Sequence, residues 1–418
     1  MRNVTFVLAA IVLVAILTGQ ASAAVYYVDR TNGVDAASGQ SPDEAWKSLA
    51  RVSAQALEPG DYVLLKRGEV WPEALAIRAS GANGLPITFG PYGDAAAAPA
   101  IDGGLPSSPS NTSLISMQDR HDVAINGLEI RNSGRSGVEI LRGLRVTLRD
   151  LTVAGSQRFG ILAFDSNGIA IEGSRIFANA LDTSDSFDGI RIDGGVSELQ
   201  GFAIRNNSIH HQVGGADWKS ANGIFLGHTT SAFATLRDVQ ITGNEIYANG
   251  NPTQNQAGRG IAGTIHGDVK VSGNYVHENA SAGVYLGDRG MLLDIVIENN
   301  TFYNNALRQF GGFTDLRARA TRNMIVVDDP SLTAMGVEVG GLGPWVLEWN
   351  TFYYATPTTD TFRGFIRLND ASQDRVLTSD RNLFYSPTPL PWKRSDGQPI
   401  PFSAWQAAGY DLDSKNPR

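Results

Sequence analysis

The stretch Ile204-Arg-Asn-Asn-Ser-Ile209 decides the fold because its pattern recurs along the chain. Each copy has apolar residues at its two ends, except the weaker last copy, which begins with Ser379, and most copies have an asparagine or serine at the fourth position. We find ten copies, at residues 125–130, 148–153, 171–176, 204–209, 241–246, 271–276, 297–302, 320–325, 347–352 and 379–384. The shortest spacing is 23 residues, and longer spacings indicate insertions into a common repeat unit.

A second pattern lies inside most units and consists of a glycine followed by alternating apolar residues. It begins at Gly137, Gly160, Gly189, Gly223, Gly260, Gly283 and Gly336. Each unit therefore contains two short strands that are too small to bury an apolar face alone. Such units become stable when successive copies stack into a solenoid. The repeat predicts an all-β chain that folds as a right-handed parallel β-helix of about ten coils.

Asparagines occupy one register of the first pattern in seven copies. They are Asn207, Asn244, Asn274, Asn300, Asn323, Asn350 and Asn382. In stacked coils these side chains lie about 4.8 Å apart, within reach of one another. We expect an internal amide ladder with a structural role.

The composition excludes several classes of protein. The 418 residues include 46 glycines and no cysteine, with 42% hydrophobic and 18% charged residues. These values exclude a disordered polymer, a disulfide-stapled miniprotein and a membrane bundle. The formal net charge of −8 argues against duplex nucleic acid as a partner.

The two ends of the chain depart from the repeat. Residues 1–23 have the charge, apolar run and small-residue site of a signal peptide cleaved after Ala23. We therefore expect a secreted or periplasmic protein, without a membrane span after cleavage, and a monomer. Residues 24–110 form an N-terminal cap and the first coils, residues 111–386 the parallel β-helix and residues 387–418 a C-terminal cap or tail. Ser41-Pro42-Asp43-Glu44, followed by apolar residues at helical spacing, predicts one amphipathic α-helix that caps the N-terminal end.

Three further segments are distinctive, namely Tyr26-Tyr-Val-Asp29, Pro86-Ile-Thr-Phe-Gly-Pro-Tyr-Gly93 and the closing stretch at residues 405–414. They resemble segments of secreted right-handed parallel β-helix proteins of the pectate-lyase-like superfamily. The resemblance covers nearly all of the chain after residue 23. It implies the fold, but that superfamily includes polysaccharide lyases, glycoside hydrolases, epimerases and adhesins, so it does not fix the chemistry.

Insertions enlarge three consecutive units between the first strand and the glycine strand. The separation is 12 residues in the first two units, 18 or 19 in the next three, and 12 again afterwards. Stacking places these loops, at about 178–188, 210–222 and 248–259, one above another beside the sheet of glycine strands. Loops grafted at one place on a rigid stack are where binding and catalytic groups concentrate.

The residues near these loops suit a charged sugar polymer. In β-elimination on a uronate, Arg259 or Arg191 would neutralise the carboxylate, Lys219, His210 or His211 would act as the base, and Tyr285 or a histidine as the acid. We predict substrate contacts from Arg191, Asn222, Phe225, His228, His266, Tyr285 and Arg289. The sequence slightly favours a uronate polysaccharide lyase that needs no cofactor.

Three alternatives remain open. Asp188 and Asp193 could serve as the carboxyl pair of a glycoside hydrolase, and Phe187-Asp-Gly-Ile-Arg-Ile192 resembles a polygalacturonase strand in which Asp188 matches an acid. The next coil has Ala221-Asn222 where that pattern has paired aspartates, which counts against that particular activity. Asp185, Asp188 and Asp193 could instead hold Ca²⁺ as oxygen ligands. A third class is a non-catalytic glycan-binding or adhesive β-helix.

Overall fold

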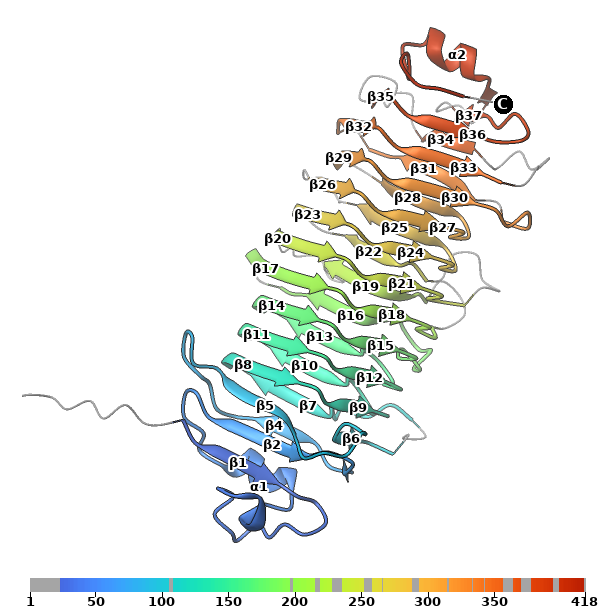
Figure 1. Cartoon of the computed structure of the whole chain (residues 1–418). Coiled ribbons are helices and arrows are strands. Elements are labelled where there is room, and N and C mark those ends of the chain that lie inside the picture. Colours follow the sequence, from blue (N-terminus) through green and yellow to red (C-terminus); the bar gives the residue numbers. More distant parts are fainter. Residues whose placement is uncertain are drawn as a thin grey trace, which may run out of the picture.

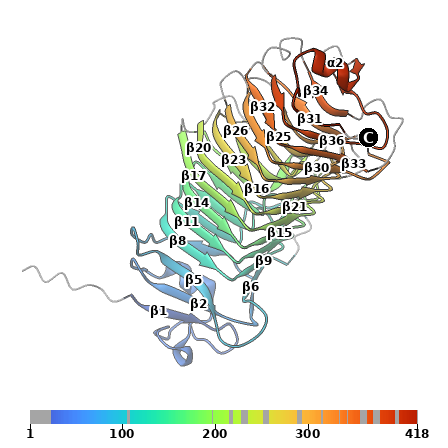
Figure 2. The same ribbon diagram turned by 45° about the horizontal axis from the view of Figure 1, so that its top comes forward.

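The computed structural model describes residues 23–104, 108–195, 198–214, 219–227, 235–251, 258–264, 266–287, 293–313, 316–332, 334–341, 343–355, 364–369, 377–393 and 398–416. The expected signal peptide lies outside these residues except for Ala23. Within them the chain forms three long sheets that run side by side along an elongated molecule (Figures 1 and 2). The fold is the expected parallel β-helix.

Sheet A has 13 strands, all parallel to their neighbours. They are β1 (Val25–Val28), β2 (Tyr62–Lys66), β5 (Ile87–Tyr92), β8 (His121–Asn126), β11 (Leu144–Arg149), β14 (Asn167–Glu172), β17 (Glu198–Arg205), β20 (Thr235–Thr242), β23 (His266–Ser272), β26 (Leu293–Glu298), β29 (Leu316–Thr321), β32 (Trp345–Glu348) and β35 (Leu377–Asp380).

Sheet B has 12 strands, most of them three or four residues long. They are β3 (Val70–Trp71), β6 (Ala100–Asp102), β9 (Glu129–Arg131), β12 (Thr152–Ala154), β15 (Arg175–Phe177), β18 (Ser208–His210), β21 (Glu245–Tyr247), β24 (Tyr275–His277), β27 (Thr301–Tyr303), β30 (Met324–Val327), β33 (Thr351–Tyr354) and β36 (Leu383–Tyr385).

Sheet C also has 13 strands, and these include the glycine strands of the repeat. They are β4 (Leu75–Ile77), β7 (Ile115–Gln118), β10 (Val138–Leu141), β13 (Ile161–Phe164), β16 (Phe187–Asp193), β19 (Ala221–Gly227), β22 (Ile261–Thr264), β25 (Ala282–Gly287), β28 (Arg308–Phe313), β31 (Met335–Val339), β34 (Gly364–Leu368), β37 (Trp392–Lys393) and β38 (Pro399–Ile400). Only the last pair, β37 and β38, is antiparallel.

Each coil therefore contains three strands rather than the two expected, and the sheets correspond to about 12 coils rather than ten. The first pattern is bent at its asparagine, so that Ile204 belongs to β17 and Ile209 to β18. The additional coils come from β1 to β6, in the segment that did not match the repeat.

The asparagine ladder forms as predicted, at the bend between sheets A and B. The Nδ2 atom of Asn207 donates to Oδ1 of Asn244 at 3.0 Å, and the same bond recurs from coil to coil as far as Asn382. Each Nδ2 also donates to a backbone carbonyl of the preceding coil, such as that of Ile171 for Asn207. Every rung thus satisfies buried polar groups that the bend would otherwise leave unpaired.

The single N-terminal cap helix predicted from Ser41 is wrong. The segment contains a 3₁₀ turn (Pro42–Glu44) and a short α1 (Leu49–Ala54), whose N-cap is Ser48 rather than Ser41. Trp46 interrupts the helix because its backbone pairs with the first strand, accepting from the Asp29 amide and donating to the Tyr27 carbonyl. The expected apolar side chains Trp46, Leu49, Val52 and Leu57 are nevertheless buried.

The other end of the solenoid is closed by the last residues described. Here α2 (Phe402–Ala407) lies beyond the final strands (Figure 1). Trp405 is fully buried and its Nε1 donates to Asp411 at 2.8 Å. Asp411 also accepts from Asn382, so the carboxylate ends the amide ladder.

Candidate functional site

The three inserted loops lie at one corner, as the sequence predicted. They connect β15 to β16, β18 to β19 and β21 to β22, and so pass from sheet B to sheet C in three consecutive coils. Backbone hydrogen bonds join neighbouring loops, from Val213 to Asn179 at 2.9 Å and from Gly250 to Gln212 at 2.9 Å. The described parts of the loops therefore form one wall beside sheet C.

A single outward column of sheet C runs past this wall. Strand register aligns Ser116, Glu139, Leu162, Arg191, Phe225, Ala262, Tyr285, Gly311 and Glu338, one from each successive coil. Ile190 and Ile192 point into the core, as expected from the period of two, which leaves Arg191 on the outer side. The prediction that Arg191, Phe225 and Tyr285 share one column is confirmed.

Asp188 and Arg191 form a buried ion pair at the centre of this face. The Arg191 Nε donates to Asp188 Oδ2 at 2.8 Å, and the residues are 6% and 0% exposed. The Arg191 guanidinium is also sandwiched between the rings of Phe159 and Phe225, at 4.8 and 4.5 Å from their centroids. Burial raises the pKa of the Asp188 carboxyl, while Arg191 and Asn222 act in the opposite direction.

Asn222 extends this ion pair into the next two coils. Its Nδ2 donates to Asp188 Oδ1 at 2.7 Å, and its Oδ1 accepts from the backbone amide of Arg259 at 3.1 Å. Both Asp188 oxygens are therefore occupied by protein donors. The side chain is fixed as a support, and it offers no free oxygen to a substrate.

Arg259, Tyr285 and Arg308 form a second group further along the same face. The Arg259 and Arg308 guanidinium carbons lie 5.5 and 4.4 Å from the Tyr285 ring centroid. Arg308 is ion-paired with Glu338, whereas Arg259 Nε is buried and has no hydrogen-bond partner among the described residues. Desolvation and the nearby Arg308 lower the pKa of Arg259.

Tyr285 is held in its protonated form. Burial is the largest effect and raises the pKa of its phenol, and Glu338 acts in the same direction. Arg308 and Arg259 oppose the shift without reversing it. A neutral phenol beside two guanidinium groups can donate a proton to a developing oxyanion.

Several predicted site residues lie elsewhere. His210 is in β18 of sheet B, stacked between Phe177 and Tyr247 at 5.1 and 4.6 Å, and the ring of the exposed His211 packs against it. His266 is buried at the start of β23 in sheet A. The assignments of His210 as a base and of His266 as a substrate contact are therefore corrected, because these residues lie on sheets B and A. His211 follows β18 in the second inserted loop, and its assignment as a base stays a prediction.

The remaining predictions have mixed outcomes. Asp193 lies on the outer side of β16, buried, and accepts from the Gly194 amide at 2.8 Å. Lys219 is half-buried in the loop before β19. Asp185 is exposed in the loop before β16, and among the described residues there is no group of three acidic or histidine side chains that could hold a metal ion. His228 and Arg289 lie outside the described residues.

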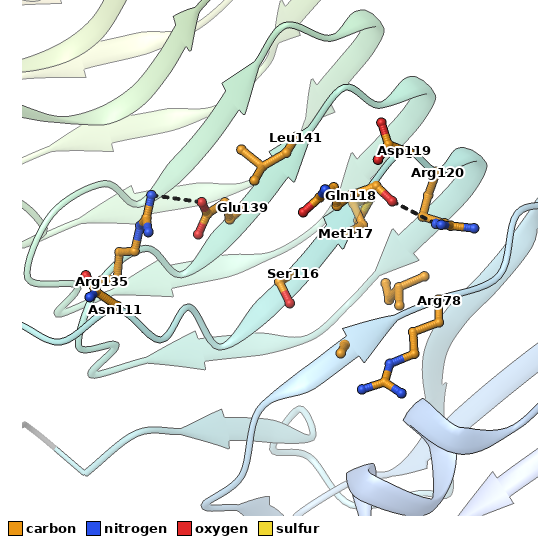
Figure 3. Close-up of a pocket in the computed structure, with 12 residues that line it drawn as sticks. Arg78, Asn111, Ser116, Met117, Gln118, Asp119, Arg120, Arg135, Glu139 and Leu141 are labelled. Atoms are coloured by element: carbon orange, nitrogen blue, oxygen red, sulfur yellow. Dashed lines mark hydrogen bonds and ion pairs between the residues drawn. The ribbon is translucent and has the colours of Figure 1, made fainter.

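Sequence reasoning missed a pocket on the first coils of sheet C. Its volume is about 400 Å³, and it is lined by side chains of β4, β7 and β10 and the adjoining loops (Figure 3). Glu139 is buried in it, accepts from the Ser113 hydroxyl and pairs with Arg135 at 3.1 Å. Glu139 occupies the same outward column as Arg191, and this register was the signal that could have revealed it.

The chain belongs to the family described as the right-handed β-helix region. That family matches residues 108–250 and 204–328, which together make up more than half of the sequence. No helix among the described residues is long and apolar enough to cross a membrane.

Two curated proteins are similar in sequence. One is a lacto-N-biosidase of Bifidobacterium longum subsp. longum, 43% identical over 82 residues, which are 19% of this chain and 5% of the relative. The other is the uncharacterized protein YwoF of Bacillus subtilis, 24% identical over 349 residues, covering 70% of this chain and 71% of YwoF. The chain thus matches only a small part of the first relative.

Solved structures share the fold at low sequence identity. The surface adhesin PfbA of Streptococcus pneumoniae gives a TM-score of 0.56 at 13% identity, covering 82% of this chain and 85% of PfbA. Pectate lyase Pel9A gives 0.54 at 17% identity, with 73% and 78% covered. A family 136 lacto-N-biosidase of Eubacterium ramulus gives 0.53 at 16% identity, with 94% and 67% covered. These likenesses show that the chain shares the β-helix fold of these proteins.

Proposed function

We propose that the protein is an exported carbohydrate-active β-helix that cleaves an acidic, uronate-containing polysaccharide by β-elimination on the outer face of sheet C. The observation that carries this proposal is the pair of guanidinium groups on either side of Tyr285. Arg259 Nε is buried and has no hydrogen-bond partner among the described residues, so an anionic group is the ligand it lacks.

The reaction needs three groups, and the proposal gives each a residue. The Arg259 guanidinium binds the uronate carboxylate and stabilises the charge that develops when the α proton is removed. The Lys219 amine, in the neighbouring loop of the wall, takes that proton. The released electron pair forms the C4=C5 double bond as the C4–O bond breaks, and the Tyr285 phenol donates its proton to the leaving glycosidic oxygen.

The site supports hydrolysis less well. A hydrolase needs two carboxyl groups that can reach the glycosidic bond. Asp188 is fully buried, with both oxygens bonded to Arg191 and Asn222, and its neighbour in the next strand is an amide rather than a carboxylate. The short similarity to a lacto-N-biosidase keeps glycoside hydrolysis as the second candidate.

Two assays on the same incubation separate these functions. The mature protein is incubated with alginate, pectate and glycosaminoglycans, with and without Ca²⁺, and both ultraviolet absorbance and reducing ends are followed. We expect both signals to rise on one acidic polymer, and Arg259→Ala to abolish both. Arg149→Ala, an exposed ion-paired arginine on sheet A, is the matched control and should retain full activity.

Other outcomes would reject the proposal. Reducing ends without absorbance would identify a hydrolase. Retention of a polymer without either signal would favour a non-catalytic glycan-binding protein. Full activity in Arg259→Ala would place the site elsewhere on the solenoid.

A further inference from the structure

The pocket on the first coils of sheet C has no role in the chemistry above. It opens where the outward column carries the small side chains of Ala76 and Ser116, and where Glu139 is held to one side by Ser113 and Arg135. A volume of about 400 Å³ is at the lower end of the range for small-ligand sites and suits one sugar unit.

The charges around the pocket are not balanced. Two of its acidic groups are neutralised locally, Glu139 by Arg135 at 3.1 Å and Asp119 by Arg142 at 2.6 Å. Arg78 and Arg120 line the same pocket, and neither forms an ion pair within the described part of the chain. The Arg120 Nε donates to the Gln118 carbonyl at 2.8 Å.

The polar groups are arranged around the opening rather than along one edge. Figure 3 shows Arg78 and Arg120 on one side, Arg135 and Asn111 on the other, and Ser116 and Gln118 between them. Amide and hydroxyl groups can bond sugar hydroxyls, guanidinium groups can bind a carboxylate, and Leu141 offers an apolar surface to a ring.

The pocket lies on the same outward column of sheet C as the proposed catalytic face. Glu139 and Tyr285 belong to the same outward column, five strand steps apart, or about 24 Å at the usual spacing between strands. Leu162, Arg191 and Phe225 lie between them on the floor of this face. A polymer laid along the column would reach both sites.

We infer that this pocket is a distal subsite that binds one carboxylated sugar unit of the polymer whose cleavage occurs beside Tyr285. The inference rests on the proposed function for the identity of the polymer. It adds a second site of anion recognition, made by Arg78 and Arg120, which increases affinity for long chains and takes no part in bond breaking.

The test uses the full mature chain carrying Tyr285→Phe, so that bound oligosaccharide is not consumed. Affinity is measured by calorimetry for an acidic disaccharide and an acidic octasaccharide. Both are prepared from the polymer that the wild type cleaves or, if it cleaves none, from the polymer that slows its migration in affinity electrophoresis. Arg78→Ala/Arg120→Ala should weaken octasaccharide binding at least about tenfold, since two charge-assisted contacts are lost, and should barely change disaccharide binding.

A second variant tests the shape of the pocket and leaves its charges unchanged. Ser116→Trp fills the hollow and should produce a similar loss for the octasaccharide, while circular dichroism and the melting temperature report on folding. Arg149→Ala, on another sheet, is the control for the loss of one exposed positive charge.

The results distinguish the two proposals. If the wild type cleaves an acidic polymer but both pocket variants bind the octasaccharide like Arg149→Ala, the subsite is overturned and the proposed function stands. If a neutral octasaccharide loses as much affinity as the acidic one, recognition of a carboxylate is overturned. If no acidic polymer is cleaved but one is bound, and the pocket variants bind its octasaccharide about tenfold more weakly, the subsite stands and the lyase proposal fails.

Discussion

Arg191 and Asp188 form an ion pair that is almost completely removed from solvent, although both residues lie on the outer side of a sheet. The Nε–Oδ2 distance is 2.8 Å, and the rings of Phe159 and Phe225 cover the two sides of the guanidinium. A charge in such a position is tolerated because its partner is fixed. Both residues belong to β16, and the hydrogen bond from Asn222 to Asp188 links the pair to β19 in the next coil.

Breaking this pair should destabilise the protein strongly. Asp188→Ala leaves the Arg191 guanidinium buried without a carboxylate, and we expect the free energy of unfolding to fall by about 3–5 kcal/mol. The double variant Asp188→Leu/Arg191→Met removes both charges and should recover most of that loss. Urea unfolding midpoints measure each variant. Additive losses in the double variant would show that the two residues do not act as a pair.

The asparagine ladder should respond to loss of one rung. In Asn300→Ala, the Val271 carbonyl loses its donor, and the Asn274 amide and side chain lose their acceptor. Buried groups left unpaired cost about 1–3 kcal/mol, so the urea midpoint should fall accordingly. The exposed Asn83→Ala is the control. An unchanged midpoint in Asn300→Ala would mean that water replaces the amide at no cost.

The sequence predicted this first ladder because one residue type recurs at one register. A second ladder, at the bend between sheets B and C, was missed. It runs through Asn179, Gln212, Asn249, Asn279 and Asn305, with Oδ1 or Oε1 of one coil accepting from the backbone amide of the preceding coil. It ends within the last of these coils, where Gln309 Oε1 accepts from the Asn305 amide. Its residue type changes at Gln212, and its position follows the inserted loops, so a fixed spacing does not reveal it.

The corner of the inserted loops was predictable because it depends only on strand spacing. The error over His210 and His266 arose because nearness in sequence was taken for nearness in space. In a coil of three strands, residues on neighbouring strands face different directions. His210 ends a strand of sheet B, and His266 begins a strand of sheet A.

Sequence reasoning also missed residues that do lie on sheet C. Glu139 and Glu338 both lie in glycine strands that the sequence pattern had identified, at the outward position. Arg308 begins a strand whose outward position is occupied by Gly311, so nothing in the repeat singles it out. Its approach to Tyr285 depends on a side-chain direction that a period of two does not supply.

His210 should make stability depend on pH. Burial, His211 and Arg175 lower its pKa to about 4, whereas an unfolded histidine titrates near 6.5. Between these values the unfolded chain binds more protons, so the free energy of unfolding falls as pH falls, by up to about 1.4 kcal/mol per pH unit. His210→Phe keeps a ring between Phe177 and Tyr247 and should reduce this slope.

The measurement is urea unfolding from pH 4 to pH 7 for the wild type and the variant. Other groups titrate in this range in both proteins, so the difference between the two slopes reports on His210. Equal slopes would show that the stacked histidine retains an ordinary pKa.

Tyr285→Phe separates proton donation from substrate binding. The ring remains between Arg259 and Arg308, so the contacts of those guanidinium groups with the aromatic face are retained. Loss of the phenolic proton donor should lower kcat by about 10²–10⁴-fold and change KM little. Tyr247→Phe on sheet B, where the tyrosine ring stacks on His210, is the control and should retain the wild-type kcat.

The pH dependence provides a second readout for the same variant. Because burial raises the pKa of Tyr285, the phenol stays protonated throughout the neutral range, and its deprotonation should limit the rate only above pH 10. If kcat falls as the pH rises but still lies below 10, the group that loses its proton is another one. A Tyr285→Phe enzyme with the kcat of Tyr247→Phe would exclude the phenol as the acid, because a ring without a hydroxyl cannot donate a proton to the leaving oxygen.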